Sequence, residues 1–199
     1  RRIAALLLAH RPEWLLSSGF AGGLHPRLAV GDLIVAENFS APELVEKCRA
    51  LPGYCQPVLP MNPNERPAAP SNMAPGSPRL FFGALTTHST VVDSIDHKTR
   101  LARETGALAV DMETGSIAKA CSAAGIPMLA LRVISDAATD PLPVPMDQWF
   151  DMQRQRPRPV ALLAFLLSHP AAIAPFTRFI SGLGPARRQL TRLLLDCAR

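Results

Sequence analysis

The sequence predicts an α/β domain with a mostly parallel sheet. Strand, helix and strand patterns alternate over residues 107–110, 114–124 and 127–134, the order of a crossover unit in a parallel sheet. The composition of the 199 residues, 48% hydrophobic and 19% charged, is typical of one folded domain and argues against disorder. No apolar run approaches the roughly 20 residues that span a bilayer, so we expect no transmembrane helix.

The first half of the chain predicts a helix, two strands and a long excursion. The apolar run 3–9 is typical of the end of a buried helix, and 14–18 of a strand. Glycines over 19–23 predict a turn, and 30–36 predicts a second strand. Residues 51–78 hold eight prolines without a periodic apolar pattern, so we expect a surface excursion.

The second half adds a strand at 80–86 and a short helix at 98–105, followed by the strand–helix–strand unit. Gly106 and Gly125 stand just past the two helices, where a left-handed cap is favoured. Residues 159–199 are typical of helical segments. Their expected breaks are Pro170, Pro175 and 182–185.

The positive charge is confined to the end of the chain. Residues 154–199 hold eight arginines and one acid, whereas residues 1–153 hold thirteen Lys and Arg against fifteen Asp and Glu. We therefore expect a main domain over 1–153 and a basic helical tail over 154–199, part of the same domain or peripheral to it. The tail lacks aromatic interleaving and any nucleic-acid-binding motif, so we expect no nucleic acid partner.

The last residues form an apolar stripe at helical spacing, with arginines off the stripe. The stripe consists of Ala186, Leu190, Leu193, Leu194 and Cys197. One interpretation is a basic amphipathic helix that makes peripheral contact with an anionic membrane through 186–199. The other is that the leucines pack on the domain and the arginines are solvated.

The four cysteines form no CxxC pair, and none stands beside a histidine at metal-ligand spacing. We expect free thiols in the reducing cytoplasm and no metal site. The chain begins with Arg1 rather than Met, so we expect an N-terminally truncated domain. Its charged and apolar start imitates a signal peptide, but no small-residue cleavage site follows.

The first segment that could carry chemistry is SSGFAGGL, residues 17–24. Glycines after a strand let backbone N–H groups face an anion. The spacing differs from the GxGxxG dinucleotide signature, so a ligand loop and a tight turn both stay open.

Carboxylates end two later strands. Asp111 and Glu113 stand directly before a helix, and Ser135 and Asp136 end the next strand. Ligands bind at the carboxyl ends of parallel strands, and adjacent strands would bring Glu113 and Asp136 into one crevice able to grip a polyol and deliver a proton. The alternatives are that these side chains favour a helix N-terminus by charge or by capping.

In this order the three segments resemble the purine nucleoside phosphorylase and methylthioadenosine/S-adenosylhomocysteine nucleosidase superfamily. The matching stretches lie at 17–36, 83–92 and 106–136. The resemblance implies a three-layer α/β/α fold, a homo-oligomer, and cleavage of the N-glycosidic bond of a purine (adenine) nucleoside. It implies no cofactor, with phosphate as a possible co-substrate. Water as the nucleophile would make a nucleosidase and phosphate a phosphorylase, and the sequence leaves both open.

Carried over residue by residue, the resemblance implies that Glu113 holds the ribose hydroxyls and that Met112 packs against the sugar. Asp136 would protonate the departing base at N7, and its apolar neighbours would favour the neutral carboxyl by desolvation. Further substrate-binding residues are expected at Ser135, Asp111, Thr90 and Val91.

The nucleophile or phosphate loop maps onto Gly19, Phe20, Ala21 and Gly22. Phe20 stands where the family usually has a Ser or Thr hydroxyl that helps hold phosphate or the attacking water. The family's first strand and glycine loop would precede Arg1. A catalytically impaired nucleoside-binding protein is therefore one alternative function.

A narrower resemblance concerns the hopanoid-associated phosphorylases. It rests on the DME form at 111–113, on VVDSIDHK at 91–98, and on the Arg- and Leu-rich tail over 156–190. It implies a lipid-linked adenosyl substrate such as adenosylhopane, reached at the inner face of the membrane. The alternative is a methylthioadenosine/S-adenosylhomocysteine nucleosidase that acts on a soluble substrate.

Overall fold

A six-stranded mixed sheet lies at the centre of the computed structural model, whose described residues are 2–54, 78–145, 150–151 and 156–197. The strand order is β3-β2-β6-β1-β5-β4. The strands are β1 Leu15–Gly23, β2 Leu33–Ala36, β3 Leu80–Gly83, β4 Leu85–Thr87, β5 Ala109–Asp111 and β6 Met128–Asp136. The pairs β1·β6, β2·β3 and β4·β5 are parallel, whereas β2·β6 and β1·β5 are antiparallel. The predicted α/β class is confirmed.

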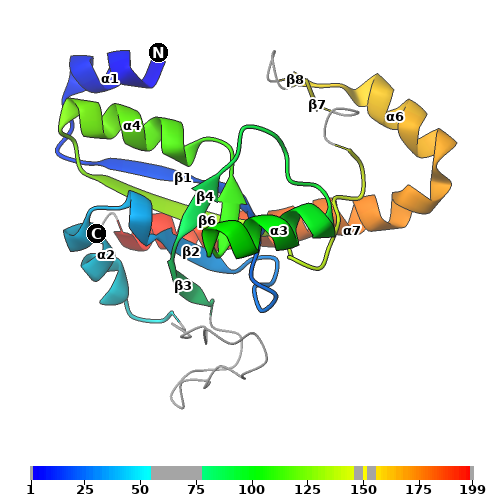
Figure 1. Ribbon diagram of the computed structural model, residues 1–199, viewed down its shortest axis with the longest axis horizontal. Helices are drawn as coiled ribbons and strands as arrows, with labels where there is room; N and C mark the ends of the chain where they lie inside the picture. The colour runs from blue at the N-terminus through cyan, green and yellow to red at the C-terminus, as the bar shows by residue number, and fades with distance from the viewer. Residues whose placement is uncertain (1, 55–77, 146–149, 152–155, 198–199) are drawn as a thin grey trace.

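Helices cover both faces of this sheet and make three layers (Figure 1). On one face lie α1 (Arg2–His10) and α4 (Thr114–Ala124); on the other lie α2 (Pro42–Arg49) and the C-terminal part of α7 (Ile173–Cys197). α3 (Ile95–Thr105) shares a smaller core cluster with β5. The remaining elements are η1 Glu37–Phe39, β7 Phe150–Asp151, β8 Arg156–Pro157, α6 Pro159–Ser168 and η2 Pro170–Ala172.

Burial on both faces explains why the central strands are continuously apolar. Along β2, Leu33 and Val35 belong to the core beneath α2 and α7, whereas Ile34 and Ala36 belong to the core beneath α1 and α4. Successive side chains of a strand point to opposite faces, so a strand covered on both sides needs apolar residues throughout. The sheet therefore separates two hydrophobic cores.

The predicted helix over 114–124 is confirmed with both of its bounds. Gly125 follows it with φ of 66°, the left-handed conformation that glycine adopts without a steric penalty. α3 begins three residues before the predicted start, because the Ser94 side chain accepts a hydrogen bond from the backbone N–H of His97.

The glycines over 19–23 do not turn the chain, so the predicted turn is wrong. They continue β1, which pairs with β6 until Gly22 lies opposite Asp136. Close approach explains the glycines: a Cβ on Gly22 would lie 3.2 Å from the Asp136 carboxylate, and one on Gly23 would lie 3.2 Å from the Asp136 carbonyl oxygen.

Two other strand predictions need correction. The strands that end at Asp111 and Asp136 are not neighbours, because β1 lies between β5 and β6 and runs antiparallel to β5. The single strand predicted over 80–86 is two strands, since β3 pairs with β2 while β4 pairs with β5. Local patterns predicted strand character correctly, but pairing depends on distant parts of the chain. Of the Pro-rich excursion, residues 55–77 lie outside the described residues.

The C-terminal helix is longer than predicted. α7 passes through Pro175 and 182–185 without a break. Pro175 lies in the first turn, where its missing N–H costs little, and packing of the later turns on the sheet maintains the helix through Pro185. The predicted break at Pro170 does separate α6 from α7.

The apolar stripe of α7 faces the protein. Ala186, Leu190 and Leu193 are buried in the core that contains Leu33 and Val35, whereas the three arginines between Ala186 and Leu193 are exposed. Of the two interpretations of this stripe, packing on the domain is the one observed. No single helix among the described residues has the length and apolar character to cross a membrane; α6 and Pro170–Cys197 meet that test only together, with a bend of 112°.

Candidate active site

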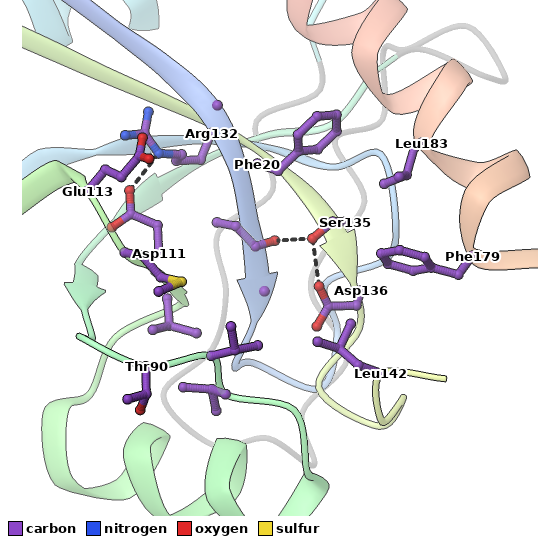
Figure 2. Close-up of a pocket in the computed structure, with 17 residues that line it drawn as sticks. Phe20, Thr90, Asp111, Glu113, Arg132, Ser135, Asp136, Leu142, Phe179 and Leu183 are labelled. Carbon is purple, nitrogen blue, oxygen red and sulfur yellow. Dashed lines mark hydrogen bonds and ion pairs between the residues drawn. The ribbon is translucent and has the colours of Figure 1, made fainter. Parts of the chain in front are cut away.

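A cavity of about 380 Å³ opens where β1, β5 and β6 converge near α7 (Figure 2). Every site residue that the sequence predicted lines it: Gly19, Phe20, Ala21, Gly22, Thr90, Val91, Asp111, Met112, Glu113, Ser135 and Asp136. Although β5 and β6 are not neighbours, they flank β1, so their carboxylates still face one cavity across that strand. The individual roles of these residues stay predictions.

Asp136, the last residue of β6, lies at one side of the cavity and is 7% exposed. One carboxylate oxygen accepts a hydrogen bond of 2.6 Å from the Ser135 hydroxyl, which also lies 3.2 Å from the Ala21 carbonyl oxygen. The other accepts a hydrogen bond of 2.5 Å from the ammonium of Lys98 on α3. Only the apolar residues that flank Asp136 along the chain could be identified from the sequence, so Lys98 was missed as its partner.

Asp111, at the end of β5, is held by donors from three other elements. Its carboxylate accepts hydrogen bonds from the Arg132 guanidinium of β6 at 2.9 Å, from the Thr87 hydroxyl of β4 at 3.0 Å, and from both the backbone N–H and the hydroxyl of Thr114 on α4. This side chain therefore caps α4 and links the strand ends. The expectation from the sequence that Asp111 binds substrate competes with this structural use.

Glu113 behaves differently from Asp111. It occupies the N-cap position of α4, yet its side chain makes no capping hydrogen bond. Its carboxylate is exposed and lines the cavity. The helix-capping explanation left open by the sequence therefore applies to Asp111, and Glu113 is the carboxylate available to a bound molecule.

Arg132 is a buried cavity residue that sequence reasoning missed. It is 2% exposed, and its five N–H groups are donated to Asp111, to the Ser17 carbonyl and hydroxyl oxygens, to the Leu131 carbonyl and to the Thr114 hydroxyl. A signal for it exists in the sequence, because Arg132 is the one charged residue inside the apolar run 127–134.

The rest of the wall is apolar. Phe20 of β1 is 42% exposed, and Leu142, Phe179 and Leu183 add apolar surface to the cavity. Phe179 and Leu183 are one turn apart on α7, on the same side of the cavity as Asp136 (Figure 2). The spacing shows a helix face, but nothing in the sequence indicates that this face reaches the ends of β1 and β6.

This arrangement suits a ligand that is polar at two points and apolar elsewhere. Asp136 and Ser135 can exchange a proton with a ring nitrogen at one side, and Glu113 can accept hydrogen bonds from hydroxyl groups at the other. Within the described part of the chain, no three His, Cys, Asp or Glu side chains gather as a metal ion would require.

The family model of the phosphorylase superfamily matches residues 2–166 of this chain. Among curated proteins, the 5'-methylthioadenosine/S-adenosylhomocysteine nucleosidase of Mycobacterium bovis is 30% identical over 164 residues, which cover 68% of this chain and 64% of that protein. The nucleosidase of the same name from Glaesserella parasuis is 27% identical over 80% of this chain and 71% of its own length. The chain thus spans less than two thirds of the mycobacterial relative.

Solved structures agree in fold. The Neisseria meningitidis 5'-methylthioadenosine/S-adenosylhomocysteine nucleosidase in complex with methylthio-immucillin-A superposes with a TM-score of 0.61 at 15% identity, over 98% of this chain and 73% of that one. A futalosine hydrolase mutant of Helicobacter pylori gives a TM-score of 0.51 at 24% identity, over 68% and 62%. At these identities the likeness concerns the fold, and it matches the three-layer architecture described above.

Proposed function

The chain belongs to the phosphorylase superfamily, and on that basis we propose that the protein is an enzyme that cleaves the N-glycosidic bond of a purine nucleoside. The observation that carries this proposal is the single cavity lined by Glu113 and Met112 on one side and by Ser135 and Asp136 on the other. Adenine is the expected base, because several relatives are named as nucleosidases of adenine-containing nucleosides.

In the proposed reaction Asp136 donates a proton to the base as the C–N bond breaks and its electron pair leaves with the base. General acid catalysis of this kind contributes about 10²–10⁴ in rate. Glu113 orients the ribose hydroxyls and, as an anion, stabilises the positive charge that develops on the sugar. Met112 supplies an apolar contact to the sugar face.

Arg132 favours water over phosphate as the nucleophile. A phosphate would need donors, and all five N–H groups of Arg132 are already donated to protein oxygens. Phe20 likewise brings a phenyl ring rather than a hydroxyl to the cavity. Phosphorolysis, with phosphate as co-substrate, is the other outcome of the test below.

The test is adenine release by the full-length protein from methylthioadenosine, S-adenosylhomocysteine and adenosine, with and without phosphate. Free adenine with an unphosphorylated sugar supports hydrolysis, and a sugar phosphate formed only with phosphate supports phosphorolysis. Binding of these nucleosides without adenine release would favour the alternative of a catalytically impaired nucleoside-binding protein. Absence of both binding and release would overturn the proposal.

A lipid-linked adenosyl nucleoside is the second candidate substrate, and the apolar surface near the cavity favours it. α6 has no charged residue, and Val160, Leu163 and Leu167 are 80%, 59% and 74% exposed. It leads through η2 into α7, whose Phe179 and Leu183 line the cavity. No acidic residue occurs between 152 and 195, so the positive charge around α6 complements an anionic membrane. Contact at the inner face of the membrane would then involve α6 rather than 186–199.

Two measurements test this candidate. A 5′-dodecylthio analogue of methylthioadenosine should give a kcat/KM at least about tenfold above the methylthio compound, because each buried CH₂ contributes about 0.8 kcal/mol. The protein should co-sediment with anionic vesicles. The triple variant Val160→Ser, Leu163→Ser and Leu167→Ser should abolish this co-sedimentation. Leu195→Ser, at a 60% exposed position of α7, is the matched control. Equal kcat/KM for the two thio compounds and no co-sedimentation would favour a soluble nucleoside in the cytoplasm as the substrate. Light scattering of the protein without vesicles tests the expected homo-oligomer.

A further inference from the structure

Lys98 is a fully buried cation directly behind the cavity. Its side chain has 0% exposure, and its ammonium donates three hydrogen bonds: to an Asp136 carboxylate oxygen at 2.5 Å, to the Ala137 carbonyl at 2.7 Å and to the Asp140 carbonyl at 2.8 Å. An ammonium has three N–H groups, so every donor of Lys98 is used. A lysine is almost never fully buried unless it is paired, and here the partner is the proposed acid.

We infer that Lys98 is a positioning residue for Asp136 that also balances its charge during the reaction, an inference that rests on the proposed glycosidic cleavage. Lys98 itself does not line the cavity. It acts through Asp136, and through the backbone of residues 137–140 that it ties to the same point.

The positioning follows from where the hydrogen bonds end. Asp136 is the last residue of β6, so the chain after it has no strand partners to fix it. Lys98 connects the Asp136 carboxylate with two carbonyl oxygens of that following segment, while Ser135 holds the second carboxylate oxygen. The carboxyl group is thus held at both oxygens beside Gly22, where a Cβ would crowd it.

The charge balance follows from the reaction step. When the Asp136 proton moves to the base, the C–N electron pair leaves with the base and a carboxylate remains on Asp136. In a buried site this carboxylate is costly unless a cation faces it, and Lys98 is that cation. The ammonium of Lys98 therefore stabilises the anion that forms as the proton leaves Asp136.

Other ionisable groups near Asp136 are less suited to this role. Arg132 lines the same cavity but is paired with Asp111, and Glu113 is an anion at the other side. On α3, His97 precedes Lys98, and its ring packs edge-on against His88 at 5.2 Å between centroids. The cation in contact with Asp136 is Lys98.

The experiment compares kcat and KM for adenine release by the full-length protein and its Lys98→Met and Lys98→Arg variants. Lys98→Met removes the charge that faces the carboxylate formed during the reaction. We expect kcat to drop about tenfold while KM changes by less than about twofold. Lys98→Arg retains the charge and should keep kcat within about threefold of the wild type.

Controls separate this role from a structural one. Lys119→Met removes a lysine of α4 that makes no contact with Asp136 and should change neither kcat nor KM. If Lys98→Met does not fold, Lys98→Gln keeps donors for the carbonyl oxygens without the charge, and the same fall in kcat with little change in KM is expected. A kcat within about threefold of the wild type, or a rise in KM that accounts for the loss, in each folded neutral variant would overturn the inference. Absence of adenine release by the wild type would instead overturn the proposed function.

Discussion

Two buried ion pairs each contain an aspartate that lines the cavity, and the protein uses the two carboxylates differently. The side chains of Arg132 and Asp111 are 3% and 5% exposed, and those of Lys98 and Asp136 are 0% and 9% exposed. Asp111 accepts hydrogen bonds from three elements besides its own strand. Asp136 accepts one from α3 and one from the residue before it.

This difference separates a structural carboxylate from a reactive one. Each donor to Asp111 comes from a chain segment that must be in place for the strand ends to meet, so its ion pair stabilises the architecture. Asp136 has a partner for each oxygen while still lining the cavity, so its ion pair fixes a group that can react. Both residues are strand-terminal aspartates in the sequence, and only their partners distinguish them.

The largest effect is expected when the structural ion pair between Arg132 and Asp111 is broken. Arg132→Met leaves the Asp111 carboxylate buried without its cation, and such a loss typically costs about 3–5 kcal/mol. Urea unfolding should show this as a lower free energy of unfolding. Arg49→Met is the matched control, because the Arg49–Glu37 pair is 40% exposed on both sides and should cost about 1 kcal/mol or less. Equal losses in the two variants would refute the structural role of Arg132.

The next effect removes the reactive group. Asp136→Asn should lower the rate of adenine release at least about 10²-fold, because an amide cannot supply the proton. Nucleoside binding should change little, whereas the free energy of unfolding should also fall, because the buried Lys98 ammonium loses its anionic partner. Stopped assays for adenine and calorimetric binding measure the two quantities. Activity within a few-fold of the wild type would mean that another group protonates the base.

A smaller, substrate-dependent effect is expected at the opposite side of the cavity. Glu113→Gln should reduce turnover of ribosides about tenfold or more, because hydrogen bonds from hydroxyls to a charged acceptor are worth about 1.5–3 kcal/mol. Turnover of 2′,3′-dideoxy analogues, which lack those hydroxyls, should fall far less, because only the stabilisation of the sugar's positive charge is lost. Steady-state kinetics on both substrates test this, and equal losses would point to a structural role for Glu113.

Sequence patterns predicted the site more fully than they predicted the sheet. Helix 114–124 and the polar site residues Asp111, Glu113, Ser135 and Asp136 follow from local features: apolar periodicity, a glycine cap, and polar residues at strand ends. Met112 followed only from the family resemblance. The order of the strands does not, because pairing of β1 with both β5 and β6 is decided by contacts far apart in the chain. The predicted turn at 19–23 was wrong because glycine permits a turn but also permits close strand packing.

The partners of the site residues were the least predictable part. Lys98 occupies a helix position three residues before buried Leu101, and a lysine there is more often solvated than buried. Its role depends on β6 ending beside α3, which no local pattern encodes. Phe179 and Leu183 likewise reach the cavity because α7 continues across Pro185, and that continuity depends on packing beneath the sheet.

The smallest expected effect concerns the pH dependence of stability at His25, which lies outside both ion pairs. Burial, aided by the charge of Arg27, lowers the pKa of His25 below its usual value near 6.5. Its Nδ1 accepts a hydrogen bond of 3.3 Å from the Arg27 backbone N–H, which requires that nitrogen to be unprotonated.

The unfolded chain therefore binds a proton at His25 more readily than the folded one does. The stability that comes from neutral His25 is complete above about pH 6.5 and is lost as pH falls toward its lower folded-state pKa. His25→Asn keeps an acceptor without a titrating ring, so the difference in Tm between wild type and variant should change by no more than about 4 °C between pH 7.5 and 5. Scanning calorimetry at both pH values measures it. A wild type that gains stability relative to His25→Asn on acidification would contradict a lowered pKa of His25 in the folded protein.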